Sequence, residues 1–138
     1  MTDFLLDQSE RPFQWGVCDC CLFVADWIAW RDKIDPAAHL RGTYSTEREM
    51  RRLLQAAGGI VAVVEDCAGR AQLVERKSAP DVGDVGLVQV AIRIWRGRAV
   101  SVPVGAICLG QGRWSIKTRE RGLMVQPFPL LRAWGRHG

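Results

Sequence analysis

Residues 19–30 carry apolar side chains at nearly every position, and only Asp26 interrupts the run. Spacings of three, four and three place four of these residues on one helical face, namely Cys20, Phe23, Trp27 and Trp30. Asp19 comes just before them and is a favourable N-cap residue. Because a helix that is apolar around its circumference is normally covered by other elements, the pattern predicts a central helix at about residues 19–30.

A second helical pattern follows after a polar loop. Thr46 and Glu49 have the spacing of a capping box, in which each side chain satisfies a free N–H group of the other. The apolar positions that continue from there have helical spacing, so a helix is predicted at residues 47–57, ending at Gly58 and Gly59. Residues 3–11 suggest a short leading helix and residues 65–71 another. The β-branched run at 60–64 fits either a strand or the start of a helix.

From Val85 onward the pattern becomes that of short strands separated by glycines. The predicted strands are residues 85–90, 91–95, 99–104, 106–109, 113–118 and 123–126. Helices followed by an antiparallel sheet define an α+β class, and the 138 residues suit a single domain spanning 1–138. Pro127 and Pro129, with Trp134 after them, predict an irregular C-terminal tail laid over the core.

Composition narrows the possible partners. The chain is 48% hydrophobic and 25% charged, with a net charge of +4 that is scattered along the sequence. No basic run resembles a nucleic-acid-binding arm, so no nucleic-acid partner is expected. The first residues lack the features of a signal peptide, and no segment has the length of a membrane span. Five cysteines, two of them adjacent, predict reduced thiols and synthesis in a cytosol.

Cys20 is the first candidate for chemistry. It is expected in the first turn of the central helix, where free N–H groups and the helix dipole favour a negative charge. Such a position favours the nucleophilic thiolate. The alternative is that Cys20 is simply a small apolar core residue, because free cysteine is among the most buried residue types.

The residues around Cys20 form a motif, Phe13-x-Trp15-Gly16-x-x-Asp19-Cys20-x-x-Phe23, that resembles the nucleophile motif of the NlpC-like, papain-fold cysteine peptidases. The chain is most similar to a branch found in tailed phages, prophages and gene transfer agents, whose genes lie among tail-tip genes. Further segments occur in the order of that branch, namely Asp35-Pro36, Arg41-Gly42-x-Tyr44-Ser45-Thr46, Gly58-Gly59, Gly83-Asp84-Val85 and Leu109-Gly110-x-Gly112-Arg113-Trp114.

The resemblance implies a papain-like fold of the NlpC type, in which the helix carrying the thiol packs on a small, barrel-like antiparallel sheet. It implies that Cys20 holds the nucleophile position, with Asp19 at the N-cap of its helix. It also places Trp15 and Trp114 beside the cleft, where they would contact a sugar or peptide. For both tryptophans, packing within the protein is the alternative.

The expected histidine base is missing from this chain. In NlpC-like enzymes it precedes a hydrophobic strand, which corresponds to residues 107–110 here and leaves Val104 or Gly105 in its place. The third polar group would fall at Ile116 or Lys117. Three substitutes are conceivable: His39 folding over Cys20, His137 arriving from the tail, or Lys117 acting as the base. The alternatives are a solvated His39, a mobile chain end and a surface Lys117.

A metal site is not expected. Cys18 and Cys21 have the spacing of half a zinc knuckle, but the chain holds no second pair. Cys67 and Cys108 are isolated in the sequence, and no histidine accompanies either of them. No cofactor is expected either.

Together these observations predict a phage-like tail-tip or baseplate-hub component on a cysteine-peptidase scaffold, catalytically impaired because its histidine is missing. Such a protein would be made in a bacterial cytoplasm and assembled into the virion tail tip, in contact with other tail-tip proteins and with peptidoglycan. The first alternative is an active peptidoglycan endopeptidase, in which Cys20 uses a non-standard base. A cysteine-based metal-binding module is a remote alternative.

Overall fold

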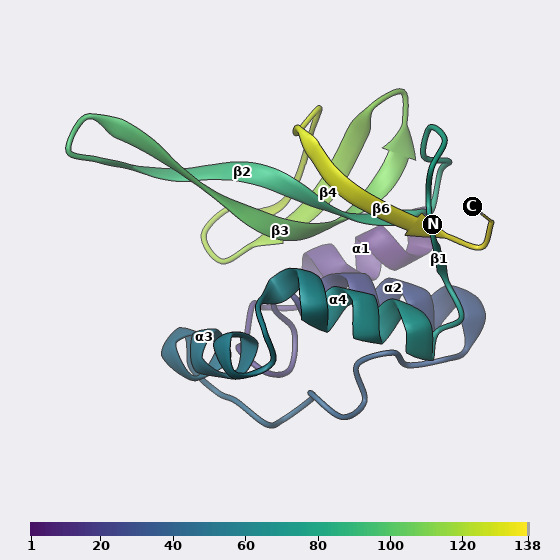
Figure 1. Ribbon diagram of the computed structural model, residues 1–138, viewed down its shortest axis with the longest axis horizontal. Coiled ribbons are helices and arrows are strands. Elements are labelled where there is room, and N and C mark those ends of the chain that lie inside the picture. Colours follow the sequence, from purple (N-terminus) through teal and green to yellow (C-terminus); the bar gives the residue numbers. More distant parts are fainter. Residues whose placement is uncertain (138) are drawn as a thin grey trace.

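The computed structural model describes residues 1–137, with the side chains of residues 92–95 left out of the description. Four helices come first and an antiparallel sheet follows, which confirms the α+β class (Figure 1). The helices are α1 (Thr2–Glu10), α2 (Leu22–Asp32), α3 (Glu47–Ala56) and α4 (Ile60–Arg70). The strands are β1 (Val74–Glu75), β2 (Val85–Trp95), β3 (Arg98–Gly110), β4 (Arg113–Thr118), β5 (Gly122–Gln126) and β6 (Leu130–Gly135).

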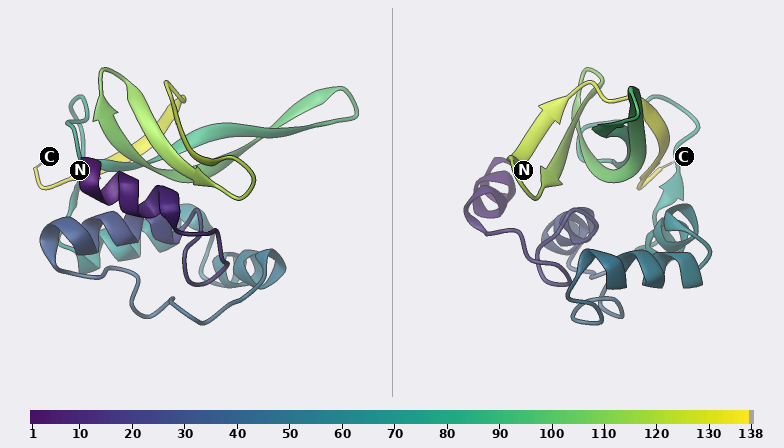
Figure 2. Two further views of the ribbon diagram at one scale, coloured as in Figure 1. Left: turned by 180° about the vertical axis from the view of Figure 1, so that it is seen from behind. Right: turned by 90° about the vertical axis from the view of Figure 1, so that its left-hand side faces the viewer.

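The six described strands form one sheet in the order β1-β6-β2-β3-β4-β5, with every neighbouring pair antiparallel. The sheet is strongly curved, and the helices lie below one of its faces (Figure 2). It is not closed, because β1 and β5 remain edge strands. The prediction of a barrel-like sheet is therefore wrong in this respect.

Several predicted strands turn out to be parts of longer ones. Residues 85–90 and 91–95 form a single strand, β2, with a register shift between Ala91 and Arg93. Residues 99–104 and 106–109 are likewise parts of β3. The C-terminal segment is not irregular, because Leu130–Gly135 forms β6 between β1 and β2. The two prolines precede this strand instead of interrupting it.

Helix α2 supplies the centre of the core, as its apolar pattern predicts. Phe23 and Ile28 are buried against the sheet residues Leu87 and Ile107, and Phe4 of α1 joins the same cluster. The regular helix runs from Leu22 to Asp32, two to three residues later than the predicted 19–30. Trp30 is 45% exposed, with its ring edge against Phe4 at 5.7 Å between centroids, so its place in the predicted buried face is wrong.

The remaining helices follow their local signals. Helix α3 begins after Thr46, whose side-chain oxygen accepts from the Glu49 amide at 3.1 Å, as the capping box predicts. Helix α4 begins at Ile60, so residues 60–64 are helical. Gly58 and Gly59 both have positive φ between the two helices, a conformation that glycine adopts without steric cost.

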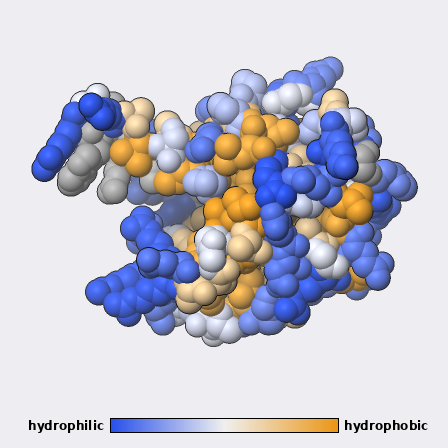
Figure 3. Space-filling view, viewed as in Figure 1, coloured by the Kyte–Doolittle hydropathy of each residue, from blue (hydrophilic) through white to orange (hydrophobic). Residues whose placement is uncertain are grey.

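Strands β2 and β3 continue beyond the rest of the sheet as a long hairpin, which projects away from the helices (Figure 1). We call residues 91–101 the arm. Its tip is hydrophilic, whereas apolar surface gathers where the sheet meets the helices (Figure 3). Arg96 and Arg98 at the tip are exposed.

None of the helices described here has both the length and the apolar character needed to cross a bilayer.

Candidate functional site

The loop before α2 is fixed by a close approach between two segments of the chain. Gly16 has a φ of 80°, and a Cβ atom at this position would lie 1.9 Å from the Tyr44 carbonyl oxygen. The Gly42 amide donates to the Gly16 carbonyl at 2.9 Å. Only glycine fits at this position. It allows the segments 13–19 and 41–44, which are separate in the sequence, to come into contact.

Asp19 is the buried centre of this meeting point. Its carboxylate is fully buried and accepts hydrogen bonds from the amides of Cys21 at 2.9 Å and Leu22 at 2.8 Å. The other carboxylate oxygen accepts from the Gly16 amide at 2.8 Å and from the Tyr44 hydroxyl at 2.6 Å. Asp19 thus supplies the acceptor for free N–H groups at the start of α2, the hydrogen-bonding pattern of an N-cap residue. Burial, together with the Asp19 contact, raises the pKa of Tyr44 far above its usual value.

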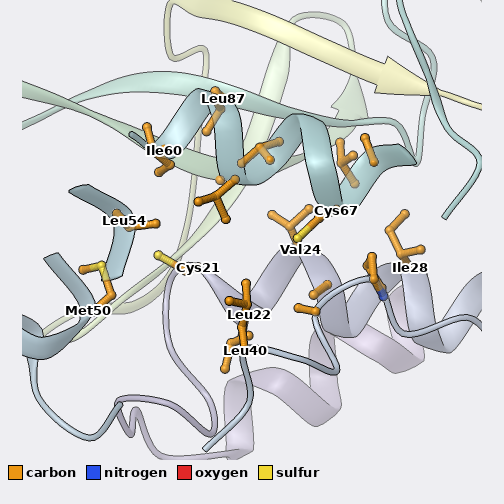
Figure 4. Close-up of a pocket in the computed structure, with 18 of the residues that line it drawn as sticks. Cys21, Leu22, Val24, Ile28, Leu40, Met50, Leu54, Ile60, Cys67 and Leu87 are labelled. Atoms are coloured by element: carbon orange, nitrogen blue, oxygen red, sulfur yellow. The ribbon is translucent and has the colours of Figure 1, made fainter. Parts of the chain in front are cut away.

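Cys20 lies in the turn directly before α2 and is partly buried. Its neighbour Cys21 is also partly buried and points into the apolar space between the helices (Figure 4). Hydrogen bonding with the Cys20 thiol, then burial and the nearby Asp19 carboxylate, raise the pKa of Cys21 well above its ordinary value. Cys21 is therefore held as a neutral thiol.

Gly105 of β3 occupies the position opposite Cys20. A Cβ atom at Gly105 would lie 3.6 Å from the Cys20 carbonyl oxygen and 2.8 Å from the Val24 side chain. The strand thus approaches the start of α2 so closely that Val24 fills the space of a side chain at 105. This is one of the two positions at which the resemblance to NlpC-like enzymes leads us to expect the missing histidine.

His39 lies elsewhere, beside helix α4. Its Nε2 atom is 3.5 Å from an Asp66 carboxylate oxygen, and Cys67 completes a group whose ligand atoms all lie within 4.8 Å of one another. The expectation that no histidine accompanies Cys67 is therefore wrong, because the loop after α2 brings His39 to it. Asp66 also accepts from Arg70 at 2.8 Å. Among residues 1–137 no hydrogen bond joins either His39 or His137 to Cys20.

Lys117 is buried, with 2% of its surface exposed, so its interpretation as a surface lysine is wrong. Its ammonium nitrogen lies 2.6 Å from the Cys18 sulfur, not beside Cys20. The same nitrogen contacts the backbone carbonyl and the side-chain oxygen of Gln8, both at 3.2 Å, and the Arg11 carbonyl at 3.3 Å. Lys117 thereby connects strand β4 with the end of helix α1 and with the loop that precedes Cys20.

The polar contacts continue from Gln8 towards the surface. The Gln8 amide donates to Asp26 at 3.1 Å, and Asp26 pairs with Arg41 at 2.7 Å. Burial raises the pKa of Asp26, while the Arg41 guanidinium opposes that shift. Asp26, the single polar interruption of the α2 pattern, is therefore explained by this network. Sequence reasoning missed Gln8, which stands among polar residues and gives no local signal, and it considered Cys18 only as a metal ligand.

The two tryptophans assigned to the cleft have different surroundings. Trp114 is 2% exposed and packs in a second core cluster, where a Cβ atom at Gly86 would approach its ring to 3.1 Å. This burial excludes direct contact between Trp114 and a ligand in the described conformation. Trp15 is partly exposed, and its ring packs edge-on against Phe13 at 4.8 Å between centroids.

An apolar pocket lies between α2, α3, α4 and the sheet (Figure 4). Its labelled lining includes Cys21, Leu22, Val24, Ile28, Leu40, Met50, Leu54, Ile60, Cys67 and Leu87. Cys21 and Cys67 are thus both at this pocket, one from each side. The pocket wall holds few polar groups that could orient a ligand, because its residues are overwhelmingly aliphatic.

These observations define an α+β protein with a thiol at the head of its central helix, a buried N-capping carboxylate and no imidazole at that thiol within the described residues. A family model for a domain of unknown function, DUF6950, matches residues 1–135. The chain therefore belongs to the DUF6950 family. No curated protein and no solved structure matches it.

Proposed function

We propose that this protein is a structural component of a phage-like tail tip or baseplate hub, built on an NlpC-like, papain-type scaffold that has lost peptidase chemistry. In this proposal Cys20 keeps the nucleophile position of the ancestral site. The protein contacts other tail-tip subunits and lies close to peptidoglycan without cleaving it.

Support for the scaffold comes from two motif segments that are apart in the sequence and touch in space. The first contains Gly16 and Asp19, and the second contains Gly42 and Tyr44. They are joined by the Gly42–Gly16 backbone hydrogen bond and by the Tyr44 hydroxyl bound to Asp19. A motif whose separate parts build one compact structure is more specific than any of those parts alone.

The observation that carries the loss of activity is Gly105 opposite Cys20. A cysteine nucleophile needs a base to remove its proton and an acid to protonate the leaving amine. Gly105 offers neither, and Val24 fills the adjacent space. Lys117 is engaged by Cys18, and His39 by Asp66, so neither of these substitutes is turned to Cys20.

The arm supports a role in assembly. A hairpin that extends beyond its own sheet adds little to a hydrophobic core, but it offers backbone and side chains to a neighbouring subunit. The exposed arginines at its tip favour a partner with an acidic surface.

The enzymatic part of the proposal is tested by incubating the purified protein with peptidoglycan and measuring new amine termini. Wild type, Cys20→Ala and the matched control Cys67→Ala should all give the same background release. Release that is present in wild type and Cys67→Ala but absent in Cys20→Ala would show an active endopeptidase and contradict the proposal.

The assembly part is tested with particles purified from producing cells. The chain should be found in the particles, and antibody labelling should place it at the tail tip. Particles that lack the chain altogether would contradict this part, whatever the outcome with peptidoglycan.

A second candidate function is an active peptidoglycan endopeptidase. The observation that favours it is the position of Cys20, which is partly exposed in the turn at the head of α2. Its base would have to come from solvent or from the substrate, because no histidine among residues 1–137 hydrogen-bonds to Cys20. The Cys20→Ala comparison above decides between the two functions.

A further inference from the structure

Cys18 and Lys117 form a buried contact that the proposed function does not use. They are 99 positions apart in the chain, are 3% and 2% exposed, and bring sulfur and nitrogen to 2.6 Å. Hydrogen bonds from N–H to oxygen are typically ~2.7–3.2 Å long, and sulfur is a larger atom than oxygen. The two atoms are therefore closer than a hydrogen bond requires.

The surroundings hold the two groups together. Lys117 has three further contacts, and all are neutral oxygen atoms of Gln8 and Arg11. Gln8 is itself 1% exposed, and its side-chain oxygen lies 3.7 Å from the Cys18 sulfur. None of these described contacts is a carboxylate, so sulfur is the one atom touching the Lys117 nitrogen that can carry a negative charge. Burial of an unpaired ammonium is costly, which favours a close and persistent pair.

The backbone fixes the pair from both sides. Cys18 closes a tight turn in which its amide and carbonyl both hydrogen-bond to Gln14 at 2.8 Å. Lys117 lies in β4, where it pairs with Leu123 of β5. Both side chains also contact the Gln8 side-chain oxygen of α1, at 3.7 Å from the Cys18 sulfur and 3.2 Å from the Lys117 nitrogen. The geometry therefore holds the two atoms ready for a covalent link between the two side chains.

We propose that Cys18 and Lys117 form an oxidative modification site, in which a single oxygen atom bridges the cysteine sulfur and the lysine nitrogen. The oxidant is dioxygen. The cysteine and lysine side chains together give up two hydrogens, and new S–O and O–N bonds form with one oxygen atom. The second oxygen atom leaves as water with the two hydrogens. Sulfur and nitrogen each give up two electrons, which together reduce one dioxygen molecule.

The bridge is reversible by thiols. Four equivalents of a thiol reductant return the free cysteine and the free amine, release the bridging oxygen as water and become two disulfides. The bridge would link β4 covalently to the turn that precedes Cys20, with α1 enclosed between them. This inference rests on the buried contact alone and holds whether or not the protein is a peptidase.

The test uses the full-length protein exposed to air-saturated buffer, followed by intact mass measurement and tryptic mapping. The expected product has gained one oxygen and lost two hydrogens. Its peptide containing Lys117 is joined to the peptide containing Cys18, and cleavage after Lys117 is lost. Treatment with dithiothreitol should restore both the original mass and the cleavage.

Three variants make the result specific. Cys18→Ser and Lys117→Met should abolish the cross-link, whereas Cys20→Ser should retain it. The Cys20→Ser control is needed because all three cysteines before α2 lie in one tryptic peptide, so the peptide mass alone does not show which sulfur is linked. The wild-type measurement stands even if a variant fails to fold. Sulfinic acid at Cys18 without a cross-link, a disulfide between Cys18 and Cys20 or Cys21, or a direct sulfur–nitrogen bond without oxygen would each overturn the proposal.

Discussion

At the scale of single residues, Asp19 has the most demanding environment in the protein. A fully buried carboxylate is tolerated because four donors surround it, three backbone amides and the Tyr44 hydroxyl. The start of α2 adds the positive end of its dipole. The same residue thereby fixes the helix, the loop before it and the segment carrying Tyr44.

Replacement of Asp19 should therefore cost much more than a single hydrogen bond. We expect Asp19→Ala to lower the free energy of unfolding by about 3–5 kcal/mol, because it leaves several buried donors unpaired. The matched control Tyr44→Phe removes one donor and should cost about 1–2 kcal/mol. Urea unfolding monitored by circular dichroism measures both. A loss in Asp19→Ala no larger than in Tyr44→Phe would contradict the assigned role.

The buried thiols predict a loss of stability in alkali. Burial, and then the Asp66 carboxylate, raise the pKa of Cys67 from 9.0 to about 11. Between these values the unfolded chain releases a proton that the native protein retains, so the free energy of unfolding falls as pH rises. The slope approaches at most about 1.4 kcal/mol per pH unit for one thiol. Cys21 has a raised pKa and acts in the same direction.

Cys67→Ala should flatten this dependence. Denaturant unfolding of wild type and variant at several values between pH 8 and about 10.5 compares the slopes, while other titrating groups cancel between the two proteins. Parallel slopes would show that Cys67 does not titrate differently in the native state.

The absent base suggests a gain-of-function experiment. Gly105→His combined with Val24→Ala places an imidazole opposite Cys20 and removes the methyl groups that occupy its space. An adjacent imidazolium favours the thiolate form of a cysteine. At a pH well below the pKa of the thiol, lowering that pKa by one unit raises the thiolate fraction about 10-fold. Alkylation of Cys20 by iodoacetamide near pH 6.5 should therefore accelerate, whereas Val24→Ala alone should not change it. Equal rates would mean that position 105 does not face Cys20.

At the scale of elements, local patterns predicted what local physics controls. The helices at α1 and α3 and the strands from Val85 onward follow from apolar spacing, caps and glycines. Strand β6 was missed because Pro127 and Pro129 suggest irregular structure. Pro129 instead lies directly before β6, and its carbonyl accepts a hydrogen bond from the Gln89 amide of β2 at 2.9 Å. Pairing of this kind depends on a partner about forty residues away, which no local window contains.

The candidate site divides in the same way. Asp19 and Cys20 could be found from their motif, because capping and helix position are local properties. The burial of Lys117 and the move of His39 to α4 could not, since each depends on tertiary contacts. Lys117 follows Ile116 in a strand, and the sequence alone does not decide whether its side chain faces solvent or the interior. The contact with Cys18 decides this, and it is a tertiary contact.

The cap of α3 gives a prediction at this scale. Only Met50 of α3 is buried, so the helix depends strongly on its first turn. Thr46→Ala should destabilise it by about 1 kcal/mol, whereas Thr46→Ser keeps the hydroxyl and should have a much smaller effect. Amide hydrogen exchange at Glu49 and Met50 measures the local opening. Equal protection in the two variants would show that the cap is not required.

At the scale of the whole molecule, the arm is separate from the layers that hold the core. Replacing residues 92–100 with an Asn-Gly turn would connect Ala91 directly to its paired residue Ser101. We expect the free energy of unfolding to change by less than about 1 kcal/mol, because the removed segment lies beyond the packed helices. Incorporation into particles should fail. A shortened protein that assembles normally would remove the arm from the interface.

The position of β6 has a consequence for how the protein is made. Ribosomes deliver segments in order, and domains acquire structure as their parts emerge. Strand β2 pairs on one side with β3 soon after synthesis, but its other side waits for Leu130–Gly135, as does β1. Throughout that interval a growing polypeptide carries an open hydrogen-bonding edge beside its apolar core, and this is when it is most exposed to mispairing with other nascent chains.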